Sequence, residues 1–272
     1  MSDARAPGSP EPWRSQLRAR LDRGEAVIGV AITSTSLDMA ALAAIAGFDF
    51  LWVEMEHSPL TLETLRHIVL TTRALPAVPF ARVPSQETWL AKRVLDAGVH
   101  GVIVPFASTP ALASQAAEAC RYPPAGRRGS GAALATSTWP DTSPYYDSSD
   151  SNVVVVAMIE EACAVEEAEA IAATEGVDVL FVGTSDLSFS LGHRGQMEHP
   201  DVLAALERVR EAASRHGKVV GLPAATPDAV SRYVDQGFRF FQAPSDLSFF
   251  AEGARRWLSP LGRATGGPRG AY

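Results

Sequence analysis

The stretch that decides the fold runs from Val153 to Glu160 and reads Val-Val-Val-Val-Ala-Met-Ile-Glu. A run of consecutive apolar and mostly β-branched residues is typical of a strand that is buried on both faces of a parallel sheet. Such a run has no local reason to end in a carboxylate. The stretch therefore predicts a buried parallel strand that delivers Glu160 to a polar site.

A second stretch, residues 178–186, repeats this pattern as Asp-Val-Leu-Phe-Val-Gly-Thr-Ser-Asp. In a barrel of alternating strands and helices, the carboxyl ends of the strands carry the chemistry. Glu160 and Asp186 would then offer oxygen ligands suited to a hard divalent cation such as Mg²⁺ or Mn²⁺. The alternative is that Glu160 merely starts the next helix, that Asp186 caps a helix, and that no metal binds.

The rest of the chain alternates regularly between short apolar runs and amphipathic segments. The runs predict strands over residues 27–32, 48–53, 78–83, 101–106, 153–159, 178–182, 219–222 and 238–242. The segments predict helices over residues 11–23, 36–46, 61–73, 87–97, 110–121, about 162–175, about 200–216, 227–236 and 247–257. Eight strands alternating with helices indicate an α/β protein with a (β/α)₈ TIM barrel. A doubly wound open sheet is the alternative, but no Gly-x-Gly-x-x-Gly motif follows the first strand.

The expected organisation is a single barrel domain over residues 11–261, preceded by a disordered tail over residues 1–10 and followed by another over residues 262–272. The alternation is interrupted by residues 122–152, which are rich in Ser, Thr, Pro and Tyr. We expect a long loop there. A loop of this length inside a compact domain is usually functional or forms an interface arm.

Composition excludes several classes of partner. The chain has 272 residues, a net charge of −7 and no basic run, which argues against nucleic acid. No apolar segment approaches the roughly 20 residues that span a bilayer, and the polar N-terminus lacks the apolar core of a signal peptide. Cys120 and Cys163 lie within helical patterns without metal-ligand spacing, so we expect inert buried thiols in a reducing cytoplasm.

Several residues near predicted strand ends could carry chemistry. His57 precedes Ser-Pro after the second strand and is the natural general base, although a buried structural histidine is the alternative. Glu54 and Glu56 flank it, and we expect one of the two to point inward. Arg82 lies in the third strand and needs an anion, either a substrate oxygen or a structural partner such as Glu54 or Glu160.

Two further groups of residues complete the survey. The segment Gly183-Thr184-Ser185-Asp186-Leu187 could present backbone N–H groups at a short helix start, which would form an anion site beside the metal. Arg127 and Arg128 suit an interface. The remaining histidines have no evident partner and are expected to be surface or capping residues: His67, His100, His193, His199 and His216.

Several motifs together resemble the signature of the HpcH/HpaI aldolase family. They are Gly47-Phe48-Asp49-Phe50 through Glu56-His57-Ser58-Pro59, Leu95-Asp96-Ala97-Gly98, Arg121-Tyr122-Pro123-Pro124-Ala125-Gly126 with Arg128-Gly129, Met158-Ile159-Glu160, and Gly183-Thr184-Ser185-Asp186-Leu187-Ser188. The likeness runs in order from about residue 14 to residue 260.

The resemblance implies a class II, metal-dependent pyruvate aldolase on a (β/α)₈ barrel, with the last helix swapped between subunits in a hexameric trimer of dimers. Glu160 and Asp186 would ligate Mg²⁺, Mn²⁺ or Co²⁺. His57 would be the base, and Arg82 would stabilise the enolate. The amides of Gly183, Thr184 and Ser185 would hold the substrate carboxylate. Asp96 would raise the basicity of His57, and we expect it to act across a subunit interface because it lies near the opposite end of its own barrel.

Two positions depart from the family pattern. Glu54 stands where the best-known aldolases carry Asp, which could reposition the water relay used with His57. Met158 stands where they carry Gln, which makes that wall of the substrate site apolar and removes a hydrogen bond. Both changes leave the metal site and the base intact, but they leave the acceptor undetermined.

Three functions remain open at this point. The first is an aldolase that forms or cleaves 4-hydroxy-2-oxo acids from a 2-oxo acid and an aldehyde. The second is an oxaloacetate decarboxylase or a condensing enzyme, similar to citrate-synthase-like or macrophomate-synthase-like members. The third is a barrel that has lost catalysis and only binds. The only lysines, Lys92 and Lys218, do not lie at strand ends, which disfavours a lysine-imine aldolase.

Overall fold

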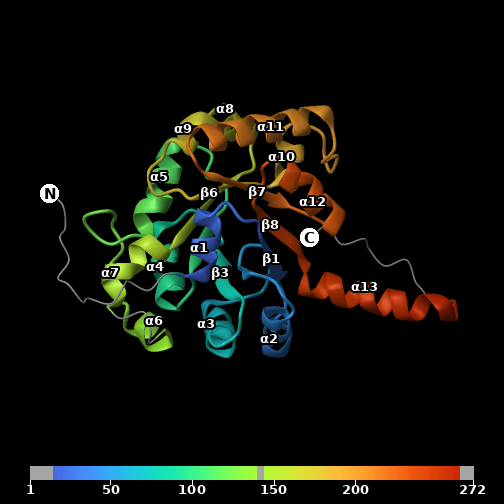
Figure 1. The fold of residues 1–272 in the computed structure, drawn as a ribbon, viewed down its shortest axis with the longest axis horizontal. Helices are drawn as coiled ribbons and strands as arrows, with labels where there is room; N and C mark the ends of the chain where they lie inside the picture. Colours follow the sequence, from blue (N-terminus) through green and yellow to red (C-terminus); the bar gives the residue numbers. More distant parts are fainter. Residues whose placement is uncertain (1–14, 140–143, 264–272) are drawn as a thin grey trace.

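The computed structural model of the protein describes residues 15–139 and 144–263 (Figure 1). Eight parallel strands close into a barrel in sequence order, and each pairs with the next along the chain. The strands are Val27–Ile32 (β1), Phe50–Glu54 (β2), Val78–Arg82 (β3), Gly101–Val104 (β4), Val154–Ile159 (β5), Val179–Val182 (β6), Val219–Pro223 (β7) and Phe240–Ser245 (β8). The predicted (β/α)₈ barrel is confirmed.

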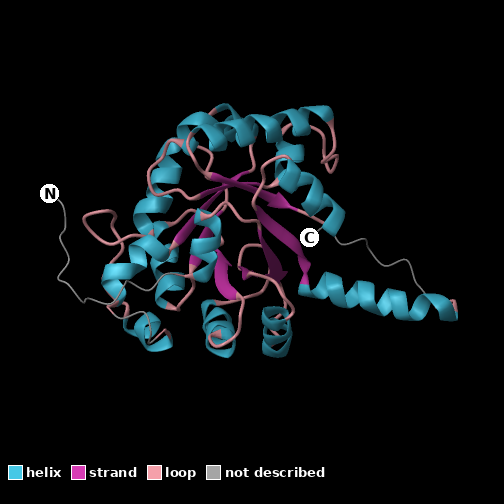
Figure 2. Cartoon of the chain, viewed as in Figure 1, coloured by secondary structure: helices cyan, strands magenta, loops and turns pink. Residues whose placement is uncertain are grey.

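Helices surround this barrel, as the cyan ring around the magenta strands shows (Figure 2). They are Leu37–Ile45 (α2), Leu62–Thr72 (α3), Thr88–Asp96 (α4), Pro110–Ala119 (α5), Ala162–Glu166 (α8), Ala168–Ala172 (α9), Thr184–Ser190 (α10), Pro200–Arg215 (α11), Pro227–Asp235 (α12) and Asp246–Leu258 (α13). The helix expected over about 162–175 is therefore broken into two. None of the helices among the described residues combines the length and the apolar character needed to cross a membrane.

The segment expected as a loop over 122–152 contains two helices, Ala133–Thr138 (α6) and Tyr145–Asn152 (α7). Serine-rich sequence has little helix propensity, so tertiary contacts decide here. Tyr146 packs edge-to-face on Tyr122, with ring centroids 4.9 Å apart. The side-chain oxygen of Asn152 accepts the backbone N–H of Ser15 (2.6 Å). The expectation of a plain loop was wrong for these residues.

The interior of the barrel is filled by large side chains, so the barrel is a packed core and not a pore. Phe50 stacks on Phe240 with ring centroids 4.6 Å apart. The ring of Phe50 occupies the space that a side chain at Gly29 would need, since a Cβ there would lie 2.1 Å from it. The helix Gln16–Asp22 (α1) closes the amino-terminal end of the barrel, with Leu17 and Leu21 joining this cluster. The open end is therefore the carboxyl end of the strands.

Helix α13 leaves the barrel at the end of β8 and projects away from it (Figure 1). Its first residue, Asp246, is buried and accepts hydrogen bonds from the backbone N–H and hydroxyl of Thr33 (3.0 and 2.9 Å). Beyond this anchor the helix exposes large apolar side chains, among them Phe250 (69% exposed) and Trp257 (72%). The 3₁₀ turn Ser259–Leu261 (η2) ends it. The tail expected over 1–10 lies outside the described residues, and so does the tail expected over 262–272 apart from residues 262 and 263.

Candidate active site at the carboxyl end of the barrel

Glu160 follows directly on β5 and is buried at the carboxyl end of the barrel, 1% exposed. Its Oε2 accepts the backbone N–H of Phe106 (2.9 Å), a residue held at φ 49°, in the left-handed region that non-glycine residues seldom adopt. Burial raises the pKa of Glu160 to about 7, although the Phe106 N–H opposes that shift. The site therefore makes the charged form of this carboxylate costly.

Asp186 lies in the first turn of α10, which begins directly after β6. Its negative charge adds to the rise in the pKa of Glu160. Gly183, which precedes α10, has room for no side chain, because a Cβ there would lie 2.6 Å from Oε1 of Glu160. The structure thus brings the two predicted metal ligands together at neighbouring strand ends, with the Gly183 backbone packed against one of them.

Arg82 is the last residue of β3 and lies inside the barrel, 6% exposed. Its Nε donates to Oε2 of Glu54 at 2.6 Å, and its Nη1 lies 3.2 Å from Oε2 of Glu56. Nη1 also approaches the sulfur of Met158 at 3.9 Å. Among the described residues, no partner is found for Nη2. One nitrogen of the guanidinium is therefore left for an anion from solution.

Glu54 organises the loop that carries the histidine. Its Oε1 accepts the backbone N–H groups of Glu56 (2.8 Å) and His57 (3.0 Å). Its Oε2 accepts the indole N–H of Trp52 (3.1 Å) as well as Arg82. A buried carboxylate with this many donors holds the chain in one conformation. Sequence analysis identified the residue but missed this role.

Glu56 also faces Arg82, so the expectation that only one of the two glutamates points inward was wrong. Burial raises the pKa of Glu56, while Arg82 and His57 act in the opposite direction. The negative charges of Glu54 and Asp186 raise it further. Its Oε2 is buried and accepts no hydrogen bond from the described residues. This oxygen is positioned to receive a proton or a ligand.

His57 lies beside these carboxylates and is open to solvent. Its side chain is 43% exposed, and its Nε2 lies 3.7 Å from Oε2 of Glu56. An imidazole in this position can exchange protons with a molecule bound at the mouth of the barrel. The alternative of a buried structural histidine is therefore wrong.

The remaining predicted substrate residues line the same end of the barrel. Met158, in β5, is buried, and its sulfur faces Arg82. Thr184 is buried and Ser185 is exposed at the start of α10, which confirms the expected short helix start. Gly183 occupies the N-cap position of that helix. The N–H groups in the first turn of α10 have no carbonyl partner within the helix, as at any helix start.

Asp96 is not part of this cluster. It ends α4, before β4 begins, and so lies toward the opposite end of the barrel from Glu160. It pairs with Arg128, whose Nη2 donates to Oδ1 at 2.8 Å and whose side chain is 1% exposed. Arg128 also lies over the ring of Tyr122, with its Cζ 4.6 Å from the centroid. Sequence analysis missed this ion pair because its partners are 32 residues apart.

The predictions for His100 and for the two cysteines were wrong in whole or in part. His100 is neither a surface nor a capping residue, because it is buried with its ring edge-on to Trp139 at 4.4 Å. Burial lowers its pKa to about 4. Cys163 is exposed and only Cys120 is buried, so the prediction of two buried thiols was half wrong. Cys163 lies in α8, on the turn that follows Glu160, where the helix faces solvent.

The residues present fit a divalent cation. Arg82 is already paired with Glu54 and Glu56, so its single charge cannot also compensate Glu160 and Asp186. Burial raises the pKa of Glu160 and of Glu56, and the neighbouring negative charges add to both rises. Carboxylate oxygens are the ligands that Mg²⁺ and Mn²⁺ prefer. A cation held between Glu160 and Asp186 would compensate their negative charge and would lower the cost of ionising Glu160.

Comparison with known proteins identifies the family of the chain. The sequence model of the HpcH/HpaI aldolase/citrate lyase family matches residues 28–252. The chain belongs to this family. It is an enzyme of the aldolase and lyase class.

Individual relatives cover nearly the whole chain. A hydroxypyruvate/pyruvate aldolase of Cupriavidus necator is 35% identical over 246 residues, which is 90% of each chain. A solved HpcH/HpaI aldolase/citrate lyase family protein from Burkholderia cenocepacia J2315 has a TM-score of 0.84 at 36% identity, covering 91% of this chain and 99% of that one. The citrate synthase SbnG has a TM-score of 0.82 at 26% identity, covering 91% and 97%. This HpcH/HpaI enzyme therefore shares its whole barrel with relatives named for different reactions.

Proposed function

We propose that the protein is a divalent-metal-dependent aldolase that forms or cleaves 4-hydroxy-2-oxo acids through a pyruvate enolate. The observation that carries the proposal is the buried Glu160, with a pKa of about 7, beside Asp186 and the one free nitrogen of Arg82. Cleavage of a carbon–carbon bond beside a hydroxyl leaves an enolate, whose charge must be stabilised.

Glu160 and Asp186 would hold the cation, Mg²⁺, Mn²⁺ or Co²⁺. Once bound, it would act as a Lewis acid toward the 2-oxo acid. The amides of Gly183, Thr184 and Ser185 would receive the substrate carboxylate at the start of α10. The N–H groups at the start of a helix have no carbonyl partner within that helix, so they are free to bind the carboxylate.

A residue after β2 would transfer the proton, and the last residue of β3 would stabilise the negative charge of the enolate. His57 would take the proton from the hydroxyl in cleavage, or from the methyl group of pyruvate in the exchange reaction. Arg82 would donate from Nη2 to the developing enolate oxygen, and Glu54 keeps the guanidinium in place for that contact. Glu56 lies between both groups and can share the proton with His57.

A second candidate is an oxaloacetate decarboxylase or a condensing enzyme. Met158 favours it, because an apolar side chain lines the site next to Arg82. The structural likeness to the citrate synthase SbnG also supports it. Both candidates pass through the same enolate, so they share every residue named above and differ in the electrophile.

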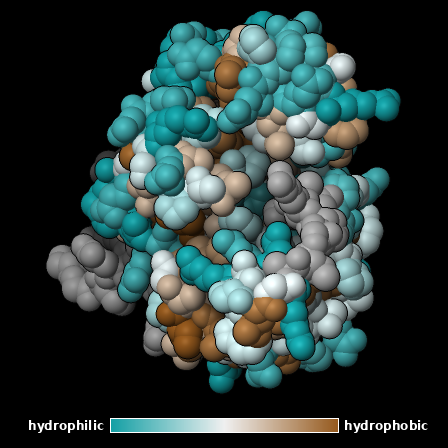
Figure 3. All heavy atoms as spheres, turned by 90° about the vertical axis from the view of Figure 1, so that its right-hand side faces the viewer, coloured by the Kyte–Doolittle hydropathy of each residue, from teal (hydrophilic) through white to brown (hydrophobic). Residues whose placement is uncertain are grey.

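We further propose that subunits assemble through α13 in a trimer of dimers, with the helix swapped onto a neighbouring barrel. The support is the projection of α13 and its exposed Leu247, Phe250 and Trp257. Figure 3, which looks at the side from which α13 projects, shows brown apolar surface in its lower half. Such an assembly would also allow Asp96 to approach the His57 of a neighbouring subunit. The free thiols support a reducing compartment such as the cytoplasm.

The test is the exchange of the pyruvate methyl protons for deuterium, followed by NMR with and without Mg²⁺ or Mn²⁺. It requires no knowledge of the electrophile. We expect metal-dependent exchange that falls to the metal-free rate in Glu160→Gln and stays unchanged in Glu161→Gln. His57→Asn should lose exchange while still binding the metal. Exchange that survives exhaustive chelation would refute the proposal, and turnover of oxaloacetate without turnover of any aldehyde would favour the second candidate.

A further inference from the structure

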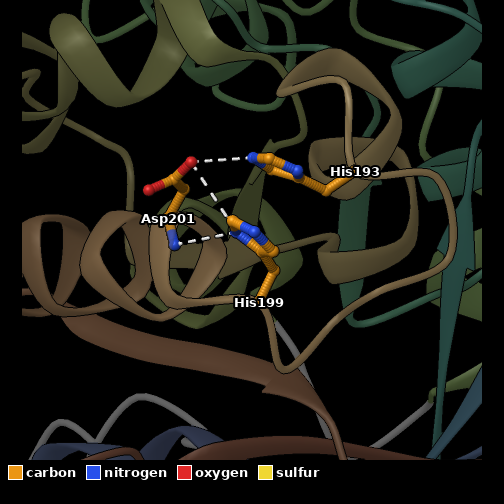
Figure 4. A group of neighbouring side chains, drawn as sticks. All are labelled: His193, His199 and Asp201. Carbon is orange, nitrogen blue, oxygen red and sulfur yellow. Dashed lines mark hydrogen bonds and ion pairs between the residues drawn. The ribbon is translucent and has the colours of Figure 1, made fainter.

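A group of potential metal ligands outside this site lies in the connection between α10 and α11 and in the first turn of α11 (Figure 4). His193, His199 and Asp201 each offer one ligand atom, and these atoms lie within 4.8 Å of one another. Nε2 of His193 is 2.7 Å from Oδ2 of Asp201, and Nδ1 of His199 is 3.6 Å from the same oxygen. Both imidazoles thus converge on a single carboxylate oxygen.

The two imidazole rings are stacked, with centroids 3.5 Å apart and planes inclined by 16°. The stacking sets the two rings side by side next to the same carboxylate, and imidazole ligates metals in its neutral form. The side chains are 25% and 28% exposed, so the rings are partly shielded while Asp201, at 63%, keeps the group open to solvent.

The backbone of this connection is held in place by its own hydrogen bonds. The N–H of His193 donates to the carbonyl of Ser188 (2.7 Å), and the N–H of Gly195 donates to the Ser188 hydroxyl (3.0 Å). The N–H of His199 donates to the carbonyl of Gln196 (2.9 Å). His199 also caps α11, with Nδ1 accepting the N–H of Asp201 (3.2 Å), a hydrogen bond that this nitrogen has to give up before it ligates a metal. The ligands are therefore presented by an ordered turn, which lowers the cost of bringing them together.

We propose that His193, His199 and Asp201 form a second metal site, which takes a transition-metal ion of the Zn²⁺ class. Zinc binds imidazole nitrogen and carboxylate oxygen at about 2.0–2.2 Å, which places neighbouring ligand atoms about 3.3 Å apart. The observed 2.7 and 3.6 Å lie on either side of that spacing. The ion would replace the proton now shared between His193 and Asp201, and water would complete its coordination.

The donor set separates this site from the one at the barrel mouth. Two imidazoles and one carboxylate favour zinc, nickel, cobalt or copper over magnesium. Glu160 and Asp186 offer only oxygen and favour the hard cations. An ion at the second site would fasten the start of α11 to the turn that follows α10, the helix that carries Asp186. The inference does not depend on the reaction proposed above.

The experiment measures zinc binding by equilibrium dialysis in the Glu160→Gln variant, so that the barrel mouth contributes no metal site. We expect one zinc ion per chain. His193→Asn and His199→Asn should each weaken binding by at least about 10-fold, the loss typical of removing even an indirect metal partner. In His199→Asn the new side chain can still cap α11, so weaker binding cannot be assigned to an unwound helix.

A matched control is His216→Asn. Nε2 of His216 also lies 2.7 Å from a carboxylate, that of Glu169, but this pair includes no second imidazole. This variant should bind zinc as the parent does. The visible absorption of Co²⁺ bound in place of zinc, and a zinc-dependent rise in Tm, should appear in the parent and the control and disappear in both site variants. Zinc binding that is absent from the parent, or equal in all four proteins, would overturn the proposal.

Discussion

Arg82 and Glu54 form a buried ion pair across the neighbouring strands β2 and β3, where the two residues are direct register partners. Nε of Arg82 lies 2.6 Å from Oε2 of Glu54, and both side chains are less than 8% exposed. Taking both charges out of water is costly, so the pair is favourable only because further hydrogen bonds surround it. It fixes the guanidinium at the strand end where a substrate oxygen would be bound.

The first prediction concerns this pair. Glu54→Gln should lower the free energy of unfolding by on the order of 3 kcal/mol, because the buried Arg82 charge then keeps only the more distant carboxylate of Glu56. Urea unfolding followed by circular dichroism measures the change. Glu25→Gln alters the solvent-accessible pairs of Glu25 with Arg20 and Arg23 and should leave the midpoint where it is. Equal shifts in the two variants would show that burial does not matter to the Glu54 pair.

The second prediction concerns pH and metal affinity. Burial raises the pKa of Glu160 to about 7, so the carboxyl is largely protonated below that pH and must lose its proton to bind a cation. The affinity for Mn²⁺ should therefore rise as pH increases up to about 7 and change little above it. Calorimetry at pH 6 in buffers of different ionisation enthalpy should also detect proton release on binding. An affinity that is constant between pH 5.5 and 8 would contradict the prediction.

The third prediction concerns His100. Burial lowers its pKa in the folded protein to about 4, whereas a histidine in the unfolded chain has a pKa of about 6.5. Below about pH 6.5 this histidine binds a proton in the unfolded chain but not in the folded protein, so the free energy of unfolding falls as pH decreases toward 4. The loss from this group should approach about 3 kcal/mol. His100→Gln should reduce the slope of stability against pH in this window, while His67→Gln, on the exposed face of α3, should not.

The fourth prediction concerns assembly. Phe250 lies on α13 with 69% of its surface exposed, which is unusual for a large apolar side chain. If α13 packs against a neighbouring subunit, Phe250→Asp should reduce the mass measured by sedimentation equilibrium to that of a smaller species. Leu203→Asp, at an exposed position on α11, is the control and should leave the mass unchanged. A parent protein that sediments as a monomer would refute the swapped helix.

Much of the barrel could be predicted because its strands carry continuous apolar runs. The bounds of β1 agree residue for residue with the expected strand, and β5 ends at Ile159, directly before Glu160, as expected. In parallel strands buried on both faces, a polar residue at the carboxyl end stands out against its neighbours. That contrast is why Glu160, Asp186 and Arg82 could be found without coordinates.

The missed features depend on contacts between distant segments. The role of Glu54 follows from its pairing with Arg82, 28 residues away, and from the fold of the loop back onto its carboxylate. The helix α7 has a sequence that favours turns, and only its packing makes it helical. The burial of His100 depends on Trp139, which follows two further helices, α5 and α6, in the chain. No local sequence pattern predicts such contacts between distant segments.

The hydrogen bond from Trp52 to Glu54 has an optical consequence. Trp52 is wholly buried, and its ring lies 5.8 Å from the Arg82 guanidinium, whereas Trp89 and Trp257 are 48% and 72% exposed. The emission of its indole therefore depends on the charges of Glu54 and Arg82, and Arg82 is the residue proposed to stabilise the enolate. Changes in occupancy at the barrel mouth should alter the blue, solvent-shielded part of the intrinsic fluorescence. The enzyme carries a built-in spectroscopic probe next to its chemistry, and ligand binding can be followed without a label.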